Sequence, residues 1–169
     1  MGRISTKENK TLFQEIRDGM ELSREEASEL LDTISADRLE KIENERLKPR
    51  PEEVLIMAEK YQAPELCNYF CSKVCEIGQQ YVPEVKMKEL PQIILETVAS
   101  LNTMHRKQER LIEIAADGVI SDDELDDFIY IQDELEKISV MVETLQLWSE
   151  RMLASGLINN EEYEKRRNK

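Results

Sequence analysis

The stretch LSREEASELLDTISADRLEKIEN, residues 22–44, decides the fold of the first half of this chain. Ser23 is a good helix N-cap, and Glu26 three residues later completes a capping box. Ser35 is the natural cap of a second helix, which begins after a short break. We therefore expect two short helices joined by a tight turn, over 23–31 and 35–44.

Three more helices are expected around this pair. Leu12, Ile16 and Met20 recur at intervals of four residues, which is typical of one buried helical face. Pro51 and Pro64 each fit the first turn of a later helix, where a missing backbone N–H does no harm. The expected ranges of these helices are 11–20, 52–61 and 65–76.

An ordered series of residues in this part of the chain carries a family resemblance. The series is Leu22-Ser23, Ala27, Leu30, Leu31, Ile34-Ser35, Leu39, Ile42-Glu43-Asn44, Lys48-Pro49 and Val54-Leu55-Met57-Ala58. It resembles the lambda-repressor-like (Xre-type) helix-turn-helix regulators of bacteria and phages, over residues 9–76. Two positions depart from the family pattern, because Asp32-Thr33 and Glu45 stand where a Gly is usual.

The resemblance implies a DNA-binding surface. In such modules the start of the second helix of the pair enters the major groove, while flanking groups hold phosphates. Carried over by position, the candidates for base contacts are Ser35, Ala36, Asp37, Arg38 and Lys41. The candidates for phosphate contacts are Arg24, Arg46, Lys48 and Arg50. The implied partner is double-stranded DNA, and the implied function is sequence-specific regulation of transcription.

The charge of the chain complicates this interpretation. The formal net charge is −13, whereas a basic footprint is the usual sign of a nucleic-acid binder. Residues 35–50 hold five basic side chains, but four acidic ones stand among them. The alternative is an acidic adaptor that keeps the helix-turn-helix fold and binds another protein.

The second half of the chain is typical of a long antiparallel helical hairpin. Its first helix is expected to begin between residues 84 and 91 and to end near Ala116, and its second to begin near Asp122. Apolar residues of the second helix alternate by three and four, as in a coiled coil. This seam consists of Phe128, Ile131, Leu135, Ile138, Val142, Leu145 and Met152. Because such a seam must be buried, we expect the hairpin to form a homodimer or to bind a partner protein.

Two corners in this half repeat one pattern. Gly118 and Gly156 each follow an expected helix end, where a positive φ is favoured. A capping residue then stands three positions before a glutamate. The capping pairs are Ser121 with Glu124 and Asn159 with Glu162. The pattern predicts a short C-terminal helix, and it explains the first corner without a calcium-binding loop.

The expected architecture is all-α with two domains. Residues 1–79 form a five-helix domain, and residues 80–169 form the hairpin and the short C-terminal helix. Strand-like runs of β-branched residues between turn signals are missing from the sequence.

The sequence offers no motif for catalysis, metal binding or membrane insertion. Cys67, Cys71 and Cys75 recur every four residues, which favours packing along a helix over a metal site. With one histidine and no glycine-rich phosphate loop, we expect neither an enzyme nor a cofactor. The start of the chain lacks the apolar core of a signal peptide, and no apolar run is long enough to span a membrane. We therefore expect a cytoplasmic protein.

Overall fold

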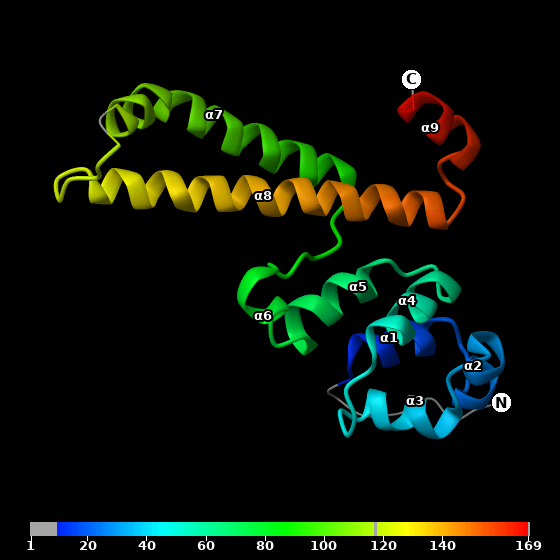
Figure 1. The fold of residues 1–169 in the computed structure, drawn as a ribbon. Coiled ribbons are helices and arrows are strands. Elements are labelled where there is room, and N and C mark those ends of the chain that lie inside the picture. Colours follow the sequence, from blue (N-terminus) through cyan, green and yellow to red (C-terminus); the bar gives the residue numbers. More distant parts are fainter. Residues whose placement is uncertain (1–9, 117, 169) are drawn as a thin grey trace. The chain divides into compact units, whose positions relative to one another are not determined.

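The computed structural model describes residues 10–116 and 118–168, and within these ranges it contains helices and no strand (Figure 1). The all-α prediction is confirmed. By packing, the chain divides into two compact units, one of Met1–Glu84 and Ser149–Lys169 and the other of Val85–Trp148. The last helix therefore falls in the same unit as the N-terminal helices.

Five helices build the N-terminal part of the first unit, and their bounds lie close to the predicted ranges. They are α1 (Leu12–Gly19), α2 (Arg24–Leu31), α3 (Ala36–Glu43), α4 (Pro51–Lys60) and α5 (Glu65–Tyr69). α2 packs on α3 and α4, while α1 packs on α3 and α5. Between them lies one core, whose fully buried members include Leu31, Ile34, Leu39, Met57 and Leu66.

The caps predicted for α2 and α3 are present. The hydroxyl of Ser23 accepts a hydrogen bond from the N–H of Glu26 (3.2 Å), and the Glu26 carboxylate accepts one from the N–H of Ser23 (2.7 Å). The hydroxyl of Ser35 accepts one from the N–H of Arg38 (3.3 Å). These bonds satisfy N–H groups at the helix starts, which have no partner inside the helix. The pair α2–α3 thus begins each helix where the sequence predicts.

Two non-glycine residues have a positive φ in the turns after these helices. Asp32 follows α2 with a φ of 59°, and Glu45 follows α3 with a φ of 57°. Such a conformation costs a non-glycine residue about 1–2 kcal/mol.

The fifth helix is shorter than the sequence predicts. α5 continues as one π-helical turn, Phe70–Val74, and a short helix α6 (Gly78–Tyr81) folds back on this turn. Gly78 makes the close approach possible, because a Cβ atom there would lie 2.0 Å from the carbonyl oxygen of Cys71. The apolar pattern of the sequence indicates neither the π turn nor α6.

The C-terminal corner follows its predicted pattern. Gly156 has a φ of 72°, and the side chain of Asn159 accepts a hydrogen bond from the N–H of Glu162 (2.9 Å). The short helix α9 (Asn160–Arg167) follows. The predicted C-terminal helix is therefore confirmed.

The second unit is a hairpin of α7 (Leu90–Ala115) and α8 (Leu125–Ala154), with α8 running on beyond the unit. Arg110, near the end of α7, donates from Nε to Oδ2 of Asp127 (2.8 Å), near the start of α8. One turn away, the ammonium of Lys107 lies 5.3 Å from the ring centre of Tyr130. The two helices are therefore antiparallel neighbours, as predicted (Figure 1). No helix within the described ranges is both long enough and apolar enough to cross a membrane.

The residues of the predicted seam in α8 do not share one environment. Ile131 is buried, Phe128, Ile138 and Met152 are half-buried, and Leu135, Val142 and Leu145 are exposed. The buried residues that the alternation of apolar residues missed are Glu134, Thr144 and Leu147. Thr144 is accommodated because its hydroxyl donates to the carbonyl oxygen of Val140 (2.6 Å). The seam is thus a mixture of two neighbouring stripes of α8, and only one of them faces α7.

Candidate nucleic-acid interface

α3 turns a polar surface outward and a mainly apolar surface inward. Leu39 and Ile42 are buried in the core, and so is the carboxylate of Glu43. The predicted base-contact residues that are exposed are Ser35, Asp37 and Lys41, and those half-buried at the edge are Ala36 and Arg38. The candidates therefore lie on or beside the outer surface of α3, which is the surface that a DNA groove would meet.

The buried carboxylate of Glu43 ties α3 to α1 and α2. Arg17 of α1 donates to it twice, from Nε to Oε1 (2.6 Å) and from Nη2 to Oε2 (2.8 Å). Arg24 of α2 donates from Nε to Oε2 (2.8 Å). Burial alone lowers the pKa of Arg17, but the hydrogen bond and the charge of Glu43 outweigh this effect and raise that pKa above its ordinary value. These hydrogen bonds fix the position of α3 against α1 and α2.

This cluster changes the role of one predicted phosphate contact. Arg24 is 30% exposed at its side chain and is already bound to Glu43. Its first role is structural. Sequence reasoning missed Arg17. Its spacing was the available signal, since Arg17 stands four residues after the buried Phe13 on the inner face of α1.

Arg38 is held by Glu53 of α4. Its guanidinium donates from Nε and from Nη2, so one whole edge of the group faces the carboxylate. The same carboxylate accepts a hydrogen bond from the backbone N–H of Arg50 (2.7 Å). The hydrogen bond from Arg38 holds the pKa of Glu53 below its usual range. An arginine reads guanine with just such a pair of N–H groups, so Glu53 competes for the edge that would read a base.

Three other candidates form ion pairs that are open to solvent. Lys41 pairs with Asp37 one turn earlier (2.6 Å), and Arg46 pairs with Glu40 (3.6 Å). Lys48 pairs with Glu76 (3.0 Å). Exposed pairs of this kind contribute about 0–1 kcal/mol each, so a phosphate can replace the carboxylate at small cost. These pairs therefore differ from Arg38–Glu53, in which the carboxylate side chain is only 13% exposed.

Arg50 is the candidate whose side chain has the fewest contacts with other charged groups of the protein. It is exposed at the start of α4, and its side chain forms no ion pair with any residue that the structure describes. Its positive charge contributes to the low pKa of Glu53, after the hydrogen bonds of that carboxylate. Arg50 would therefore give up no ion pair with a described residue of this chain if it bound a phosphate.

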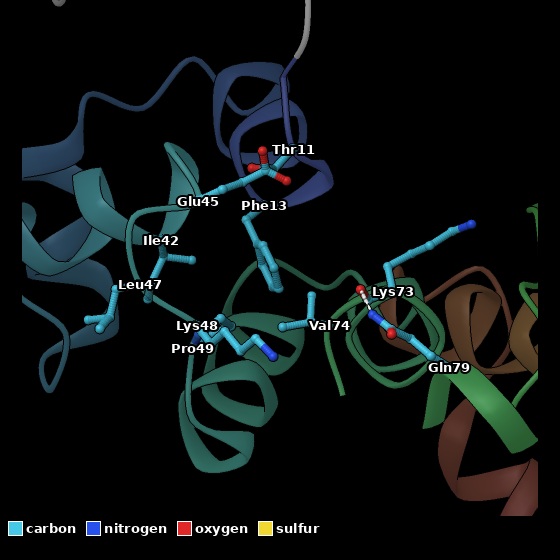
Figure 2. A pocket seen from close by; sticks show the side chains of 10 residues that line it. All are labelled: Thr11, Phe13, Ile42, Glu45, Leu47, Lys48, Pro49, Lys73, Val74 and Gln79. Atoms are coloured by element: carbon cyan, nitrogen blue, oxygen red, sulfur yellow. Dashed lines mark hydrogen bonds between the residues drawn. The ribbon is translucent and has the colours of Figure 1, made fainter. Parts of the chain in front are cut away.

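The loop after α3 rests beside a small pocket of about 180 Å³. Figure 2 shows that Phe13, Ile42 and Val74 come from three separate segments to line it. Lys48 and Pro49 form the side toward the loop. The loop that carries the phosphate candidates is therefore seated on α1 and on the π-helical turn.

The three cysteines lie along α5 and the segment that follows it. All three are half-buried free thiols. Burial raises the pKa of the Cys67 thiol, which keeps it protonated near neutral pH. Cys75 lies past the π-helical turn in an extended conformation, so the regular ladder predicted from the spacing ends at Val74. Within the described part of the chain, no group of three or more His, Cys, Asp or Glu residues is placed to hold a metal ion.

A comparison of the chain with protein-family models, curated proteins and solved structures finds no match.

Proposed function

We propose that this protein is a sequence-specific DNA-binding regulator that inserts α3 into the major groove. The observation that carries the proposal is the arrangement of α2 and α3, in which the start of α3 is exposed and polar while its inner face is fixed by Glu43. The resemblance of residues 9–76 to lambda-repressor-like regulators points the same way.

The exposed residues divide into two roles. Asp37 and Lys41 can meet base edges, since a carboxylate accepts from cytosine and an ammonium donates to guanine. Ser35 and Ala36 sit at the same end of α3, where a hydroxyl bonds either kind of base edge and a methyl group contacts thymine. Arg46, Lys48 and Arg50 follow in one exposed loop and hold the phosphates on the flank.

Binding in this way exchanges internal ion pairs for contacts with DNA. Each carboxylate that gives up a cation becomes an unpaired negative charge beside the duplex, and the chain as a whole carries −13. We therefore expect modest affinity that falls steeply as salt is raised. Specificity rests on the few base contacts rather than on the general attraction that a basic domain has for DNA.

A second candidate function is an adaptor that binds another protein. It is favoured by one observation, namely that Arg24, Arg38, Lys41, Arg46 and Lys48 all contact carboxylates of this chain. In that case these ion pairs remain formed while the protein acts, and DNA does not displace them.

A binding experiment with the full chain separates the two functions. Pooled genomic fragments are tested by mobility shift at low and moderate salt, and the dissociation constant on a retained fragment is then measured by fluorescence anisotropy. We expect selective retention. The double variant Arg46→Glu, Lys48→Glu should weaken binding to every sequence and flatten the salt dependence by about two phosphate contacts.

The control that makes the same change of charge is the double variant Lys86→Glu, Arg106→Glu, at two exposed basic residues far from the loop in sequence. It should leave both the affinity and the salt dependence nearly unchanged. Absence of retention at any salt by folded wild-type protein contradicts the regulator and favours the adaptor. An unchanged salt slope in the double variant contradicts the assignment of phosphate contacts.

A further inference from the structure

α7 carries an exposed stripe that is separate from the side chains holding it to α8. The stripe runs through Ile94, Val98, Leu101, His105, Gln108 and Ile112, all of which are exposed. Its members alternate by four and three residues, so they share one face of the helix. Leu101 is 51% exposed and Ile112 is 61% exposed, which is unusual for large apolar side chains in a regular row.

α8 carries a matching stripe. It consists of Leu125, Phe128, Gln132, Leu135, Ser139 and Val142, of which Phe128 is half-buried and the others are exposed. Neither stripe contains an Asp, Glu, Lys or Arg, although these residues make up 35% of the chain. An uncharged, largely apolar row in so charged a chain is typical of an interaction surface rather than of a solvated face.

The two stripes lie on the same side of the hairpin. Ile94 directly follows the buried Ile93, and Leu135 directly follows the buried Glu134. Each stripe is therefore turned by about 100° in the same sense from the face that packs inside the hairpin. Two antiparallel helices are related by a twofold axis perpendicular to the plane that contains both helix axes. Equal turns from the inner face therefore bring both stripes to the same side of that plane.

The register of the hairpin aligns the two stripes along their length. Arg110 meets Asp127, and Lys107 meets Tyr130, so three residues forward on α7 match three residues back on α8. Continued along the helices, this register places the apolar members side by side in three layers. The layers are Ile112 with Leu125, Leu101 with Leu135, and Ile94 with Val142. The surface they form is called the uncharged face below.

The size of the uncharged face suits a stable protein contact. At 1.5 Å per residue the row from Ile94 to Ile112 is about 27 Å long, and two helices are about 20 Å wide together. The flat area is then about 500 Å², and side-chain relief brings the accessible area toward the roughly 800 Å² that each partner of a standard interface buries.

We propose that the uncharged face binds the same face of a second copy of this chain, so that two hairpins form a four-helix bundle. Two copies with a charge of −13 each repel one another, so a contact surface that adds no further charge is favoured. The uncharged face meets this condition for a second copy, whereas a basic or acidic partner would leave its own charges unpaired on it.

Charge also sets the orientation of the two hairpins. Five acidic residues and no basic one lie between Asp122 and Asp127, at the tip end of the hairpin. Side by side, two such tips would repel over a Debye length of about 8–10 Å. The hairpins therefore run in opposite directions, with the layer of Leu101 and Leu135 near the twofold axis and the end layers exchanged between copies.

The mass of the full chain in solution tests the contact. Light scattering at micromolar concentration should give twice the mass of one chain for the wild type. Leu101→Glu and Leu135→Glu each place a charge near the axis opposite its own copy, and should raise the dissociation constant by about a hundredfold or more. Both side chains are exposed in the single chain, so the helical circular dichroism should be kept.

The matched control is Leu95→Glu, which makes the same change on the same helix at a more exposed position outside the uncharged face. It should leave the mass of two chains. A single-chain mass for wild-type protein overturns the proposal and leaves the face to a partner of another sequence. Full dissociation by Leu95→Glu, or none by Leu101→Glu and Leu135→Glu, overturns the assignment of the face.

Engineered cysteines test the orientation. Leu101→Cys, near the axis, should form a disulfide-linked pair under mild oxidation, and Ile112→Cys should not, because the axis separates the two copies of residue 112. The wild type corrects for the native cysteines. Equal cross-linking of Ile112→Cys shows the tips together and contradicts the opposite-direction arrangement.

Discussion

The N-terminal helices and the hairpin differ in how far they bury their large side chains. In α1–α5 most of the large apolar residues pack in one core, and two arginines bind the buried Glu43. In the hairpin only a few side chains are fully buried, while Leu101, Leu135 and Val142 face outward. The first region thus has a closed core and most of its surface cations in ion pairs, whereas the second carries a continuous row of uncovered apolar side chains.

The largest expected effect tests how firmly the first region is closed. Glu43→Ala removes the buried carboxylate that Arg17 and Arg24 share, and it leaves Arg17 with only Asp18 and the carbonyl oxygen of Leu22 among its described partners. Breaking a buried ion pair on one side costs about 3–5 kcal/mol. The free energy of unfolding, measured with denaturant and far-ultraviolet circular dichroism, should fall by that amount. Glu40→Ala, an exposed carboxylate on the same helix, should lower it by less than about 1 kcal/mol. Equal losses in the two variants would show that Glu43 has no special place.

The second prediction concerns a contact that only glycine allows. A methyl group on Gly78 would meet the backbone of Cys71, which cannot turn aside as a side chain can. Overpacking of this kind costs about 1–3 kcal/mol, so Gly78→Ala should lower the melting temperature. The control is Gly19→Ala in α1, where the added methyl meets no atom within 4 Å. It should be neutral or stabilising by up to about 1 kcal/mol. A harmless Gly78→Ala would mean that α6 does not pack on the π-helical turn.

The third prediction separates the two regions by concentration. Trp148 is the only tryptophan of the chain and belongs to the hairpin unit, so its fluorescence reports on that unit. If a second copy covers the hairpin, each tenfold rise in protein concentration stabilises it by about 1.4 kcal/mol. The fluorescence transition should therefore move upward in temperature with concentration in the wild type and stay fixed in Leu135→Glu. A wild-type transition that ignores concentration contradicts the pairing of hairpins.

The sequence predicted the parts of the fold that depend on near neighbours. Ser23 with Glu26 and Ser35 mark the starts of α2 and α3 because a cap bonds only to the next three residues. The partner of Arg38 escaped prediction, because Glu53 stands fifteen residues away and meets Arg38 only after the loop between α3 and α4 has folded back. The sequence therefore indicates which residues α3 exposes, but it does not indicate that Glu53 holds Arg38.

The hairpin shows the same limit at the level of a helix face. Alternation by three and four fits any stripe along a helix, and α8 has apolar residues in two adjacent stripes. Ile131 belongs to the buried one and Leu135 to the exposed one. The seam predicted from the sequence contains residues of both stripes, because packing against α7, and not the sequence of α8, determines which stripe is buried. The polar Glu134 and Thr144 are buried for the same reason, since their positions rather than their character turn them inward.

The smallest expected effect concerns the ion pair between Arg38 and Glu53 and how much its loss would change the affinity for DNA. Glu53→Gln removes the charge that holds Arg38 but keeps an oxygen that can accept from the N–H of Arg50. A freed Arg38 can then turn to the groove, and a gain of up to about 1 kcal/mol corresponds to an affinity increase of about three- to fivefold. Fluorescence anisotropy measures it, with Glu52→Gln, the exposed neighbouring carboxylate, as the control for net charge.

The pH dependence of this gain follows from the low pKa of Glu53. The hydrogen bond from Arg38 depresses that pKa, so the stability contributed by the pair is complete above the ordinary glutamate range and is lost only as the pH falls through the lowered value. Between pH 5.5 and 8 the carboxylate stays ionised and Arg38 stays held. The ratio of affinities between Glu53→Gln and wild type should therefore be constant over this range. A ratio that shrinks toward pH 5.5 would mean that protonation already releases Arg38 in the wild type. Equal gains from Glu52→Gln would reduce the effect to net charge and leave Arg38 without a special part in reading DNA.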